Sequence, residues 1–325
     1  MNPVTKTLGA MWFAPNNGRP ALQKTIKDIF LPRLGVAWTV GQNWVVRGGF
    51  GVFTQPWSQD WYASGASGLG AALVCGTSDS TQLTPRFIFS DSNPNLNCAQ
   101  ASRDPGGYNG QSVSFYPYDT PAARNFQWSL SIQRKFGGLV TEVAYVGNHV
   151  INLPFPNNID QVTVDKMPQS AANSSLAQSL RPYPQYTGIG SSGGYYNAVS
   201  NYNSAQLSVR KRFARGVSFD ANYTWSKMMS EQDSSGWSSN AGTAYWQNAY
   251  LPGVNYGRSN LDRTHLFKAD GIYQFPFGKG RQLLNHGGPI DWVAGGWQLS
   301  GILQYQSGQP YTPTMSSNNS GALVG

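Results

Sequence analysis

Residues Asn203–Phe213, NSAQLSVRKRF, and Gly216–Ser226, GVSFDANYTWS, decide the fold that this sequence predicts. In each stretch apolar and polar side chains alternate, which is typical of a β-strand with one apolar and one polar face. In the second stretch the apolar face carries Val217, Phe219, Ala221, Tyr223 and Trp225. Only Ala214 and Arg215 lie between the two stretches, so we expect a β-hairpin with a tight turn.

The same unit recurs along the chain and predicts four hairpins, at about residues 33–53, 124–148, 202–227 and 263–306. The turn within each hairpin is mostly short, whereas the connections between hairpins are long and rich in Ser, Gly, Asn, Pro and Tyr. Long loops without regular structure normally argue against a strand assignment. Transmembrane β-barrels are the exception, because they combine short periplasmic turns with long extracellular loops.

Two further features favour a barrel that crosses a membrane. The predicted strands have roughly nine to twelve residues, and about 9–11 tilted residues cross the hydrocarbon of a bilayer. Aromatic side chains also lie near both ends of the strands, as the girdles of such barrels require. The expected girdle residues are Phe136, Phe213 and Phe275 near the short turns, and Tyr202, Trp225 and Tyr305 near the long loops.

The polar face of the same strands is predicted to line the lumen. Its charged side chains would be costly toward lipid; they are Arg210, Arg212, Asp220, Lys268 and Asp270. The sequence thus predicts an all-β fold, an antiparallel up-and-down transmembrane β-barrel that is only partial. A secreted carbohydrate-binding β-sandwich is an alternative, although sandwich strands are usually shorter, with turns about every 8–12 residues at both ends.

Composition separates this chain from a cytosolic enzyme. Charged residues make up only 12% of it and aromatic residues 13%, whereas soluble proteins carry about 25% charged residues. The net charge of +8 is not gathered into a long basic run, so no nucleic-acid partner is expected. The chain has no apolar stretch of about 18 residues that would predict a transmembrane helix, and its start lacks the apolar core of a signal peptide.

No set of residues in the sequence converges on catalysis. The three histidines, His149, His265 and His286, are far apart, and no metal-binding spacing occurs. The glycine-rich stretch Gly48–Gly51 lacks the strand–loop–helix context of a phosphate-binding loop. We therefore expect neither an enzyme nor a cofactor, and the carboxylates of the strands are interpreted as lumen lining.

The long connections hold the remaining candidate residues. Cys75 and Cys98 lie in one of them and are interpreted as a disulfide of an oxidising compartment, with two unpaired thiols as the alternative. The same connection is rich in Asp and Asn, which could bind calcium but are better explained as turn formers. Ligand recognition by ring stacking is proposed for four loop residues, with packing among the loops as the alternative. They are Trp57, Trp61, Trp237 and Trp246.

A series of motifs resembles the barrel of Oar-like TonB-dependent receptors in order and spacing. They are Pro32–Val36 leading to Val46–Phe50, Asn222–Lys227 (NYTWSK), Ser259–His265 (SNLDRTH), Phe275–Gly280 (FPFGKG), and Gly295–Gly301 (GGWQLSG) followed by Gln306–Pro310. The resemblance implies a barrel of about 22 strands with an N-terminal plug. It also implies a TonB box that engages the energising complex of the inner membrane, and uptake of a bulky nutrient such as a glycan, a peptide or a metal chelate.

The chain also departs from that family. We find no signal peptide, plug or TonB box in it, and its predicted strands are too few. We therefore expect a fragment, with residues 1–31 as a tail of a preceding element, 32–313 as part of a receptor barrel and 314–325 as a truncated end. The expected partners are outer-membrane lipid, the TonB complex through a missing N-terminal region, and an unidentified extracellular ligand. An outer-membrane structural or adhesion barrel without active transport is the alternative.

Overall fold

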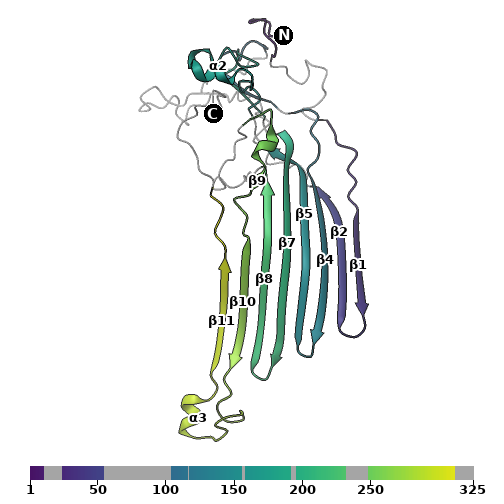
Figure 1. Ribbon diagram of the computed structural model, residues 1–325, viewed down its shortest axis with the longest axis vertical. Helices are drawn as coiled ribbons and strands as arrows, with labels where there is room; N and C mark the ends of the chain where they lie inside the picture. Colours follow the sequence, from purple (N-terminus) through teal and green to yellow (C-terminus); the bar gives the residue numbers. More distant parts are fainter. Residues whose placement is uncertain are drawn as a thin grey trace, which may run out of the picture.

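The main element of the computed structural model is one antiparallel β-sheet whose long strands follow one another in chain order (Figure 1). The structure describes residues 1–10, 24–54, 104–115, 117–155, 158–191, 195–231 and 248–311. The strands of the sheet are β1 (Arg33–Val40), β2 (Trp44–Thr54), β4 (Arg124–Phe136), β5 (Leu139–Phe155), β7 (Tyr195–Ala214), β8 (Val217–Ser230), β10 (His265–Gln274) and β11 (Gln298–Gln306), with the short β9 (Gly257–Arg258) attached to β8. Within the described residues, β1 and β11 are the two edges and do not pair with each other.

Short turns gather at one end of the sheet, the lower end in Figure 1. Gly137 and Gly138 join β4 to β5, and Arg215 and Gly216 join β7 to β8. Gly137 has a φ of 58°, a left-handed conformation that a residue without Cβ adopts at little cost. The β10–β11 connection is longer and holds the helix α3 (Pro289–Ala294). All the other long connections leave the opposite end, so the predicted fold class is confirmed.

Two neighbouring strands are much longer than a bilayer requires. β5 has 17 residues and β7 has 20, whereas about 9–11 tilted residues span the hydrocarbon. Both strands extend past the expected hairpin limits at residues 148 and 202, and their pairing becomes irregular between Val150 and Pro154. The outer parts of β5 and β7 therefore extend past the ends of β4 and β8, toward further structure at that end of the sheet (Figure 1).

That structure is a small folded unit at the long-connection end, which we call the outer cap. It is built from residues 1–10, 104–115, 158–191 and 248–256. Its regular elements are the parallel pair β3 (Ser112–Phe115) and β6 (Gly188–Ser191), the helix α2 (Met167–Ala172), and the single turns η2 (Ser174–Leu176) and η3 (Pro252–Asn255). Its apolar core consists of Tyr108, Val113, Tyr186 and Ile189, with Ile159 and Tyr183 packed against it. Sequence periodicity predicted only loops here, because these contacts join segments far apart in the chain.

None of the helices in the described part of the chain has the length and apolar character required to cross a bilayer.

Candidate functional site

One face of the sheet is apolar from edge to edge, and the strand register explains why. Val143 on β5 lies opposite Ile132 on β4 and Leu207 on β7, and residues facing each other across strands share a face. The exposed large apolar side chains of this apolar face include Leu34, Val36, Trp38, Leu130, Ile132, Val143, Leu207, Trp225, Leu299, Leu303 and Tyr305. No second layer of the described residues covers them. An exposed apolar surface of this extent marks contact with a membrane or another protein.

Not all six expected girdle residues occupy the predicted position. Trp225 and Tyr305 lie on the apolar face near the long connections, with 60% and 68% of their surfaces exposed. Phe136 lies on the same face beside a short turn. Phe275 directly follows β10 and makes an edge contact with Tyr273, with ring centroids 5.1 Å apart.

Two girdle residues differ from the expectation in their position. Tyr202 pairs with Asn148 and Met228, and it is an odd number of residues from Ala205, which faces Trp225. Tyr202 therefore lies on the polar face, because successive side chains of a strand alternate between faces. Phe213 falls within the β-bulge between Lys211 and Ala214 at the end of β7.

Charged side chains form a row on the polar face. The guanidinium Nε of Arg210 donates to Oδ2 of Asp220 at 2.6 Å, and the side-chain amide of Asn222 donates to Oδ1 of the same carboxylate at 2.7 Å. Asp270 on β10 faces Asp220 directly, and Lys268 faces Asn222. Arg212 lies in the bulge of β7, where its backbone N–H donates to the carbonyl of Gly138. The register thus brings four of the five predicted lumen residues onto one face of three adjacent strands.

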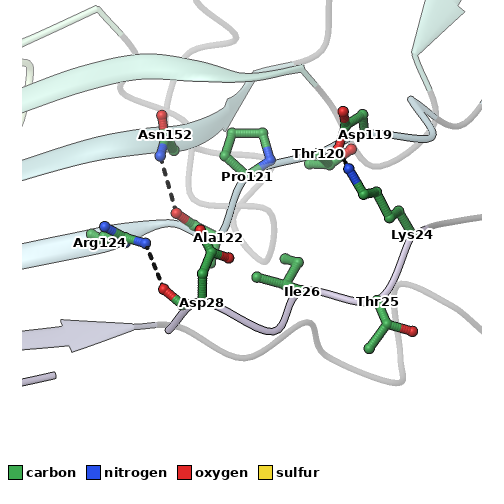
Figure 2. Close-up of a pocket in the computed structure, with 10 residues that line it drawn as sticks. All are labelled: Lys24, Thr25, Ile26, Asp28, Asp119, Thr120, Pro121, Ala122, Arg124 and Asn152. Carbon is green, nitrogen blue, oxygen red and sulfur yellow. Dashed lines mark hydrogen bonds and ion pairs between the residues drawn. The ribbon is translucent and has the colours of Figure 1, made fainter. Parts of the chain in front are cut away.

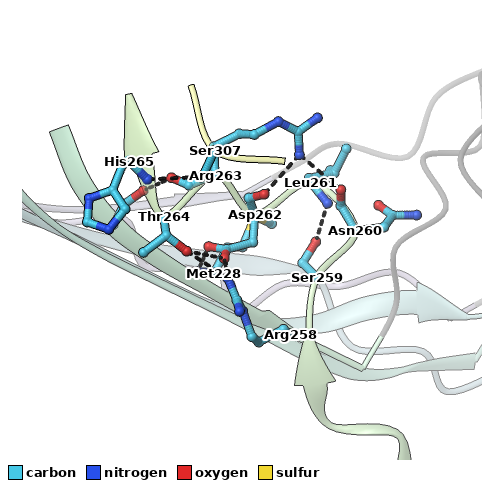
Figure 3. A network of polar contacts seen from close by, with 11 residues as sticks. Met228, Arg258, Ser259, Asn260, Leu261, Asp262, Arg263, Thr264, His265 and Ser307 are labelled. Carbon is cyan, nitrogen blue, oxygen red and sulfur yellow. Dashed lines mark hydrogen bonds and ion pairs between the residues drawn. The ribbon is translucent and has the colours of Figure 1, made fainter. Parts of the chain in front are cut away.

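The motif SNLDRTH forms a compact hydrogen-bonded corner, shown in Figure 3, that fastens the outer ends of β8, β9 and β10. Its centre is Asp262, of which 1% is exposed. The carboxylate accepts hydrogen bonds from Nη2 of Arg258 at 2.6 Å and from the backbone N–H of Met228 at 2.7 Å. Burial alone raises the pKa of Asp262, but the bonds from Arg258 and Met228 outweigh burial, and the net pKa is below the ordinary value of 3.8. We call this group the outer corner.

The outer cap contains a second buried carboxylate. Asp160 is completely buried and accepts a hydrogen bond from the backbone N–H of Tyr183 at 2.8 Å. Arg181 lies 3.6 Å from its Oδ2 and is itself largely buried. Burial is the largest effect and raises the pKa of Asp160 to about 6, although Tyr183 and Arg181 both oppose that rise. The buried pair links the start of the cap segment 158–191 to its later part.

A cavity of about 380 Å³ lies where segment 24–28 passes the outer ends of β4 and β5 (Figure 2). Arg124 donates to the backbone carbonyl of Asp28 at 3.1 Å, and Lys24 forms an exposed ion pair with Asp119. The lining residues are Lys24, Thr25, Ile26, Asp28, Asp119, Thr120, Pro121, Ala122, Arg124 and Asn152. Because cations and carboxylates line it in equal number, the cavity has no preference for one sign of charge.

Several predicted residues lie outside the described part of the chain. They are the candidate disulfide partners Cys75 and Cys98 and the candidate recognition residues Trp57, Trp61, Trp237 and Trp246. Most of the Asp- and Asn-rich stretch considered for calcium also lies there. Among the described residues, no group of three or more His, Cys, Asp or Glu side chains could hold a metal ion.

Sequence reasoning missed the basic residues on the apolar face, which include Arg134, Lys211 and Lys227. Arg134 on β4 faces Trp44 on β2 and Thr141 on β5, so its side chain belongs to the apolar set. Its guanidinium carbon lies 4.5 Å from the ring centroid of Trp44 and 4.2 Å from that of Phe136. The signal was available, because a cation stands at an apolar position of the period-two pattern, between Ile132 and Phe136.

Comparisons with solved structures return outer-membrane proteins at low identity. The FpvA structure from P. aeruginosa with bound pyoverdine has 12% identity and a TM-score of 0.41, and the match covers 88% of this chain and 24% of that one. The alcaligin outer-membrane receptor FauA from Bordetella pertussis has 13% identity and a TM-score of 0.38, covering 87% and 30%. The FrpB iron transporter from Neisseria meningitidis has 11% identity and a TM-score of 0.36, covering 75% and 24%. The chain thus spans less than a third of the length of these proteins.

No curated protein matches the chain. The family described as outer membrane beta barrel domain matches residues 1–325, which is the whole sequence. This match agrees with the antiparallel meander, the short turns at one end and the uncovered apolar face. The chain therefore belongs to the outer membrane beta barrel domain family, as part of a non-enzymatic β-barrel located in the outer membrane.

Proposed function

We propose that this chain is part of the barrel of an Oar-like TonB-dependent receptor that takes up a bulky nutrient. The observation that carries the proposal is the difference between the two ends of the sheet. Tight turns and one short helix form the lower end, whereas β5 and β7 continue upward into a folded outer cap (Figure 1). A receptor needs structure on its outer side, where the ligand arrives, and such loops are the usual location of binding residues.

The two faces of the sheet supply the second argument. The apolar face contacts lipid, because a side chain such as Leu207 gains from hydrocarbon, whereas a charge there is costly. The polar face lines the lumen and carries Arg210, Asp220, Lys268 and Asp270, with Arg212 at its periplasmic rim. A lumen lined with paired charges and amides suits the passage of a hydrated, polar nutrient. The secreted β-sandwich is abandoned, because the family is that of an outer-membrane barrel.

The receptor motifs supply the third argument. The motif SNLDRTH builds the outer corner, in which Asp262 holds the start of β10 to the end of β8. NYTWSK supplies Ser226, whose hydroxyl donates to the carbonyl of Arg263 at 2.8 Å. Two motifs of the resemblance thus meet in one structural unit, which supports a common barrel design rather than a chance likeness of separate segments.

The remaining parts of the proposal concern regions beyond the described residues. We propose that Trp57, Trp61, Trp237 and Trp246 stack on the ligand at the outer surface, and that a disulfide between Cys75 and Cys98 stiffens that surface. Further strands, a plug and a TonB box would come from a longer gene product, with residues 32–313 as one part of its barrel. The nutrient would be a glycan, a peptide or a metal chelate.

One observation favours the alternative of a structural or adhesion barrel. The tyrosines in the apolar core of the outer cap point inward, and Tyr186 there is 2% exposed. A cap whose rings pack on one another offers fewer of them to a ligand. The alternative predicts a barrel that carries this cap but is not coupled to inner-membrane energy.

The experiment that separates these two functions begins with the gene. An open reading frame that continues upstream into a plug and a TonB box, and downstream into further strands, is the result the receptor proposal predicts. The full gene product should then co-purify with the periplasmic domain of TonB, and deletion of the TonB box should abolish this. Intact flanking sequence that encodes no plug, or a product that does not bind TonB, would favour the structural barrel.

A further inference from the structure

The periplasmic rim of the apolar face carries two basic side chains. The register places Arg134 in the row of Trp44 and Thr141, and Lys211 in the adjoining row opposite Leu139. Both residues lie close to the short turns, because β4 ends at Phe136 and β7 ends at Ala214. A cation at this depth lies at the level of the lipid headgroups, where it costs about 0–1 kcal/mol instead of the 2–4 kcal/mol of the bilayer midplane.

Arg134 is held in place but has unused hydrogen-bond donors. Its guanidinium carbon is 4.5 Å from the Trp44 ring and 4.2 Å from the Phe136 ring, and such stacking suits the flat face of a guanidinium. The N–H donors lie at the edge of that plane and stay available. Among the described residues, the guanidinium of Arg134 has neither a hydrogen-bond partner nor an ion pair.

Comparison with Arg47 on the polar face shows a different arrangement. Arg47 on the neighbouring strand β2 lies on the polar face, and its Nη1 donates to the side-chain carbonyl of Gln133 at 3.1 Å. The polar face satisfies Arg47 from within the protein, whereas Arg33 on the same face stacks on the Phe53 ring at 4.7 Å. The apolar face around Arg134 offers rings, aliphatic groups and the Thr141 hydroxyl, which donates to the backbone carbonyl of Arg134, so an anionic acceptor for the guanidinium has to come from outside the protein.

We propose that Arg134 binds the phosphodiester of an anionic phospholipid in the periplasmic leaflet, with Lys211 as the second cation. The fork of an arginine matches two phosphate oxygens. Lys211 lies two strands away, about 10 Å across the sheet, and its long side chain brings the ammonium toward the same headgroup. Leu139 and the side-chain methyl of Thr141 lie between them and contact the lipid below its phosphate. The site rests on the assignment of the apolar face to lipid, and is independent of TonB and of any nutrient.

The test measures lipid binding to the full gene product purified in a non-ionic detergent, by native mass spectrometry with 1-palmitoyl-2-oleoyl-phosphatidylglycerol. Arg134→Gln should weaken the tightest binding about five- to ten-fold. The lipid affinity of Arg134→Lys should lie between those of the wild type and Arg134→Gln, because lysine keeps the charge but loses the forked guanidinium and its stacking on the rings. Lys135→Gln is the matched control, since it removes one charge from the adjacent residue on the opposite face. A diacylglycerol with the same acyl chains, which lacks phosphate, should bind all variants equally.

Each outcome has a defined meaning. Equal binding by the wild type and Arg134→Gln would overturn the site while leaving the face assignment intact. A larger effect of Lys135→Gln than of Arg134→Gln would show that the faces are exchanged, and would overturn both the site and the proposed orientation. Equal losses of lipid binding in Arg134→Gln and Lys135→Gln would overturn the specific site, because they would indicate only general attraction between a basic rim and an anionic lipid. Heat-dependent migration on gels checks folding, and Arg134→Lys decides the result if Arg134→Gln does not fold.

Discussion

Arg210 and Asp220 face each other across the β7–β8 hairpin, with Nε of the arginine 2.6 Å from Oδ2 of the aspartate. This ion pair lies on the face opposite to Leu207 and Trp225, so one hairpin contains both an apolar surface and a charged one. The two surfaces are separated only by the alternation of side chains along the strands.

The Arg210–Asp220 pair should add little to stability. About 66% of the Arg210 side chain is exposed, and exposed pairs contribute about 0.2–1 kcal/mol. A double-mutant cycle with Arg210→Gln and Asp220→Asn, read from urea unfolding in lipid vesicles, should give a coupling energy below about 1 kcal/mol that shrinks with added salt. A coupling of several kcal/mol would mean that this part of the lumen is dry.

A charge should destabilise the fold far more on the apolar face than on the polar face. Leu207→Arg puts a cation on the apolar face in mid-strand and should cost about 2–4 kcal/mol of folding free energy in a bilayer. Ser208→Arg adds the same group one residue further on, toward the polar face, and should change the free energy by less than about 1 kcal/mol. Urea titrations in vesicles measure both, and similar costs for the two variants would refute the assignment of the faces.

The outer corner should depend on ionised Asp262. Asp262→Asn removes the charge that Arg258 binds in a buried place and should destabilise the β8–β10 end by about 1.5–3 kcal/mol. Because the pKa of Asp262 in the folded protein lies below 3.8, the stabilisation is complete above pH of about 4 and is lost as the pH falls further. Proteolysis of the 258–265 segment at several pH values measures this, with exposed Asp270→Asn as the control.

The outer cap should respond to pH in the opposite direction. Burial raises the pKa of Asp160 from 3.8 to about 6, so the folded cap binds a proton more tightly than the unfolded segment. The cap is therefore most stable below pH of about 4 and loses up to about 3 kcal/mol as the pH rises through 6. Three groups face this carboxyl and contribute to the response, namely Arg181, Tyr183 and Tyr250.

Hydrogen exchange of the Tyr183 amide, corrected for the intrinsic pH dependence of exchange, measures the response of the cap. Protection should fall between pH 4 and pH 7 in the wild type and stay level in Asp160→Asn. Protection that rises over this range in the wild type would show that Arg181 stabilises the ionised form more than burial opposes it.

Local alternation was sufficient to predict the sheet, since a period of two along Asn203–Phe213 fixes both the strand and its faces. It was insufficient for Tyr202, because nearness to a strand end does not say on which face a ring lies. The register decides that, and here it selects the polar face. Arg134 was missed for a related reason. A charged residue is not expected on the apolar face, but the position of Arg134 in the period-two alternation puts its side chain there.

The outer cap could not be predicted from local pattern at all. Its core joins Tyr108 and Val113 to Tyr186 and Ile189, and Gln185 fastens the N-terminal segment through the carbonyls of Leu8 and Gly9, both at 2.8 Å. These contacts connect short irregular segments more than 70 residues apart, as the 76-residue separation between Ser112 and Gly188 illustrates. β5 and β7 also exceed the length that the alternation predicted, since their outer ends pair with each other beyond the ends of β4 and β8.

The most direct test of the central claim, that one face of this sheet contacts lipid and the other lines an aqueous lumen, is a nitroxide scan along β7. Spin labels at each position from 203 to 210 would be introduced into the full gene product, with Cys75 and Cys98 replaced by serine, and reconstituted in vesicles. Contact with dissolved oxygen should peak at positions 205, 207 and 209, and contact with a water-soluble nickel chelate at 204, 206 and 208. Equal access of the nickel chelate to both sets would contradict the account.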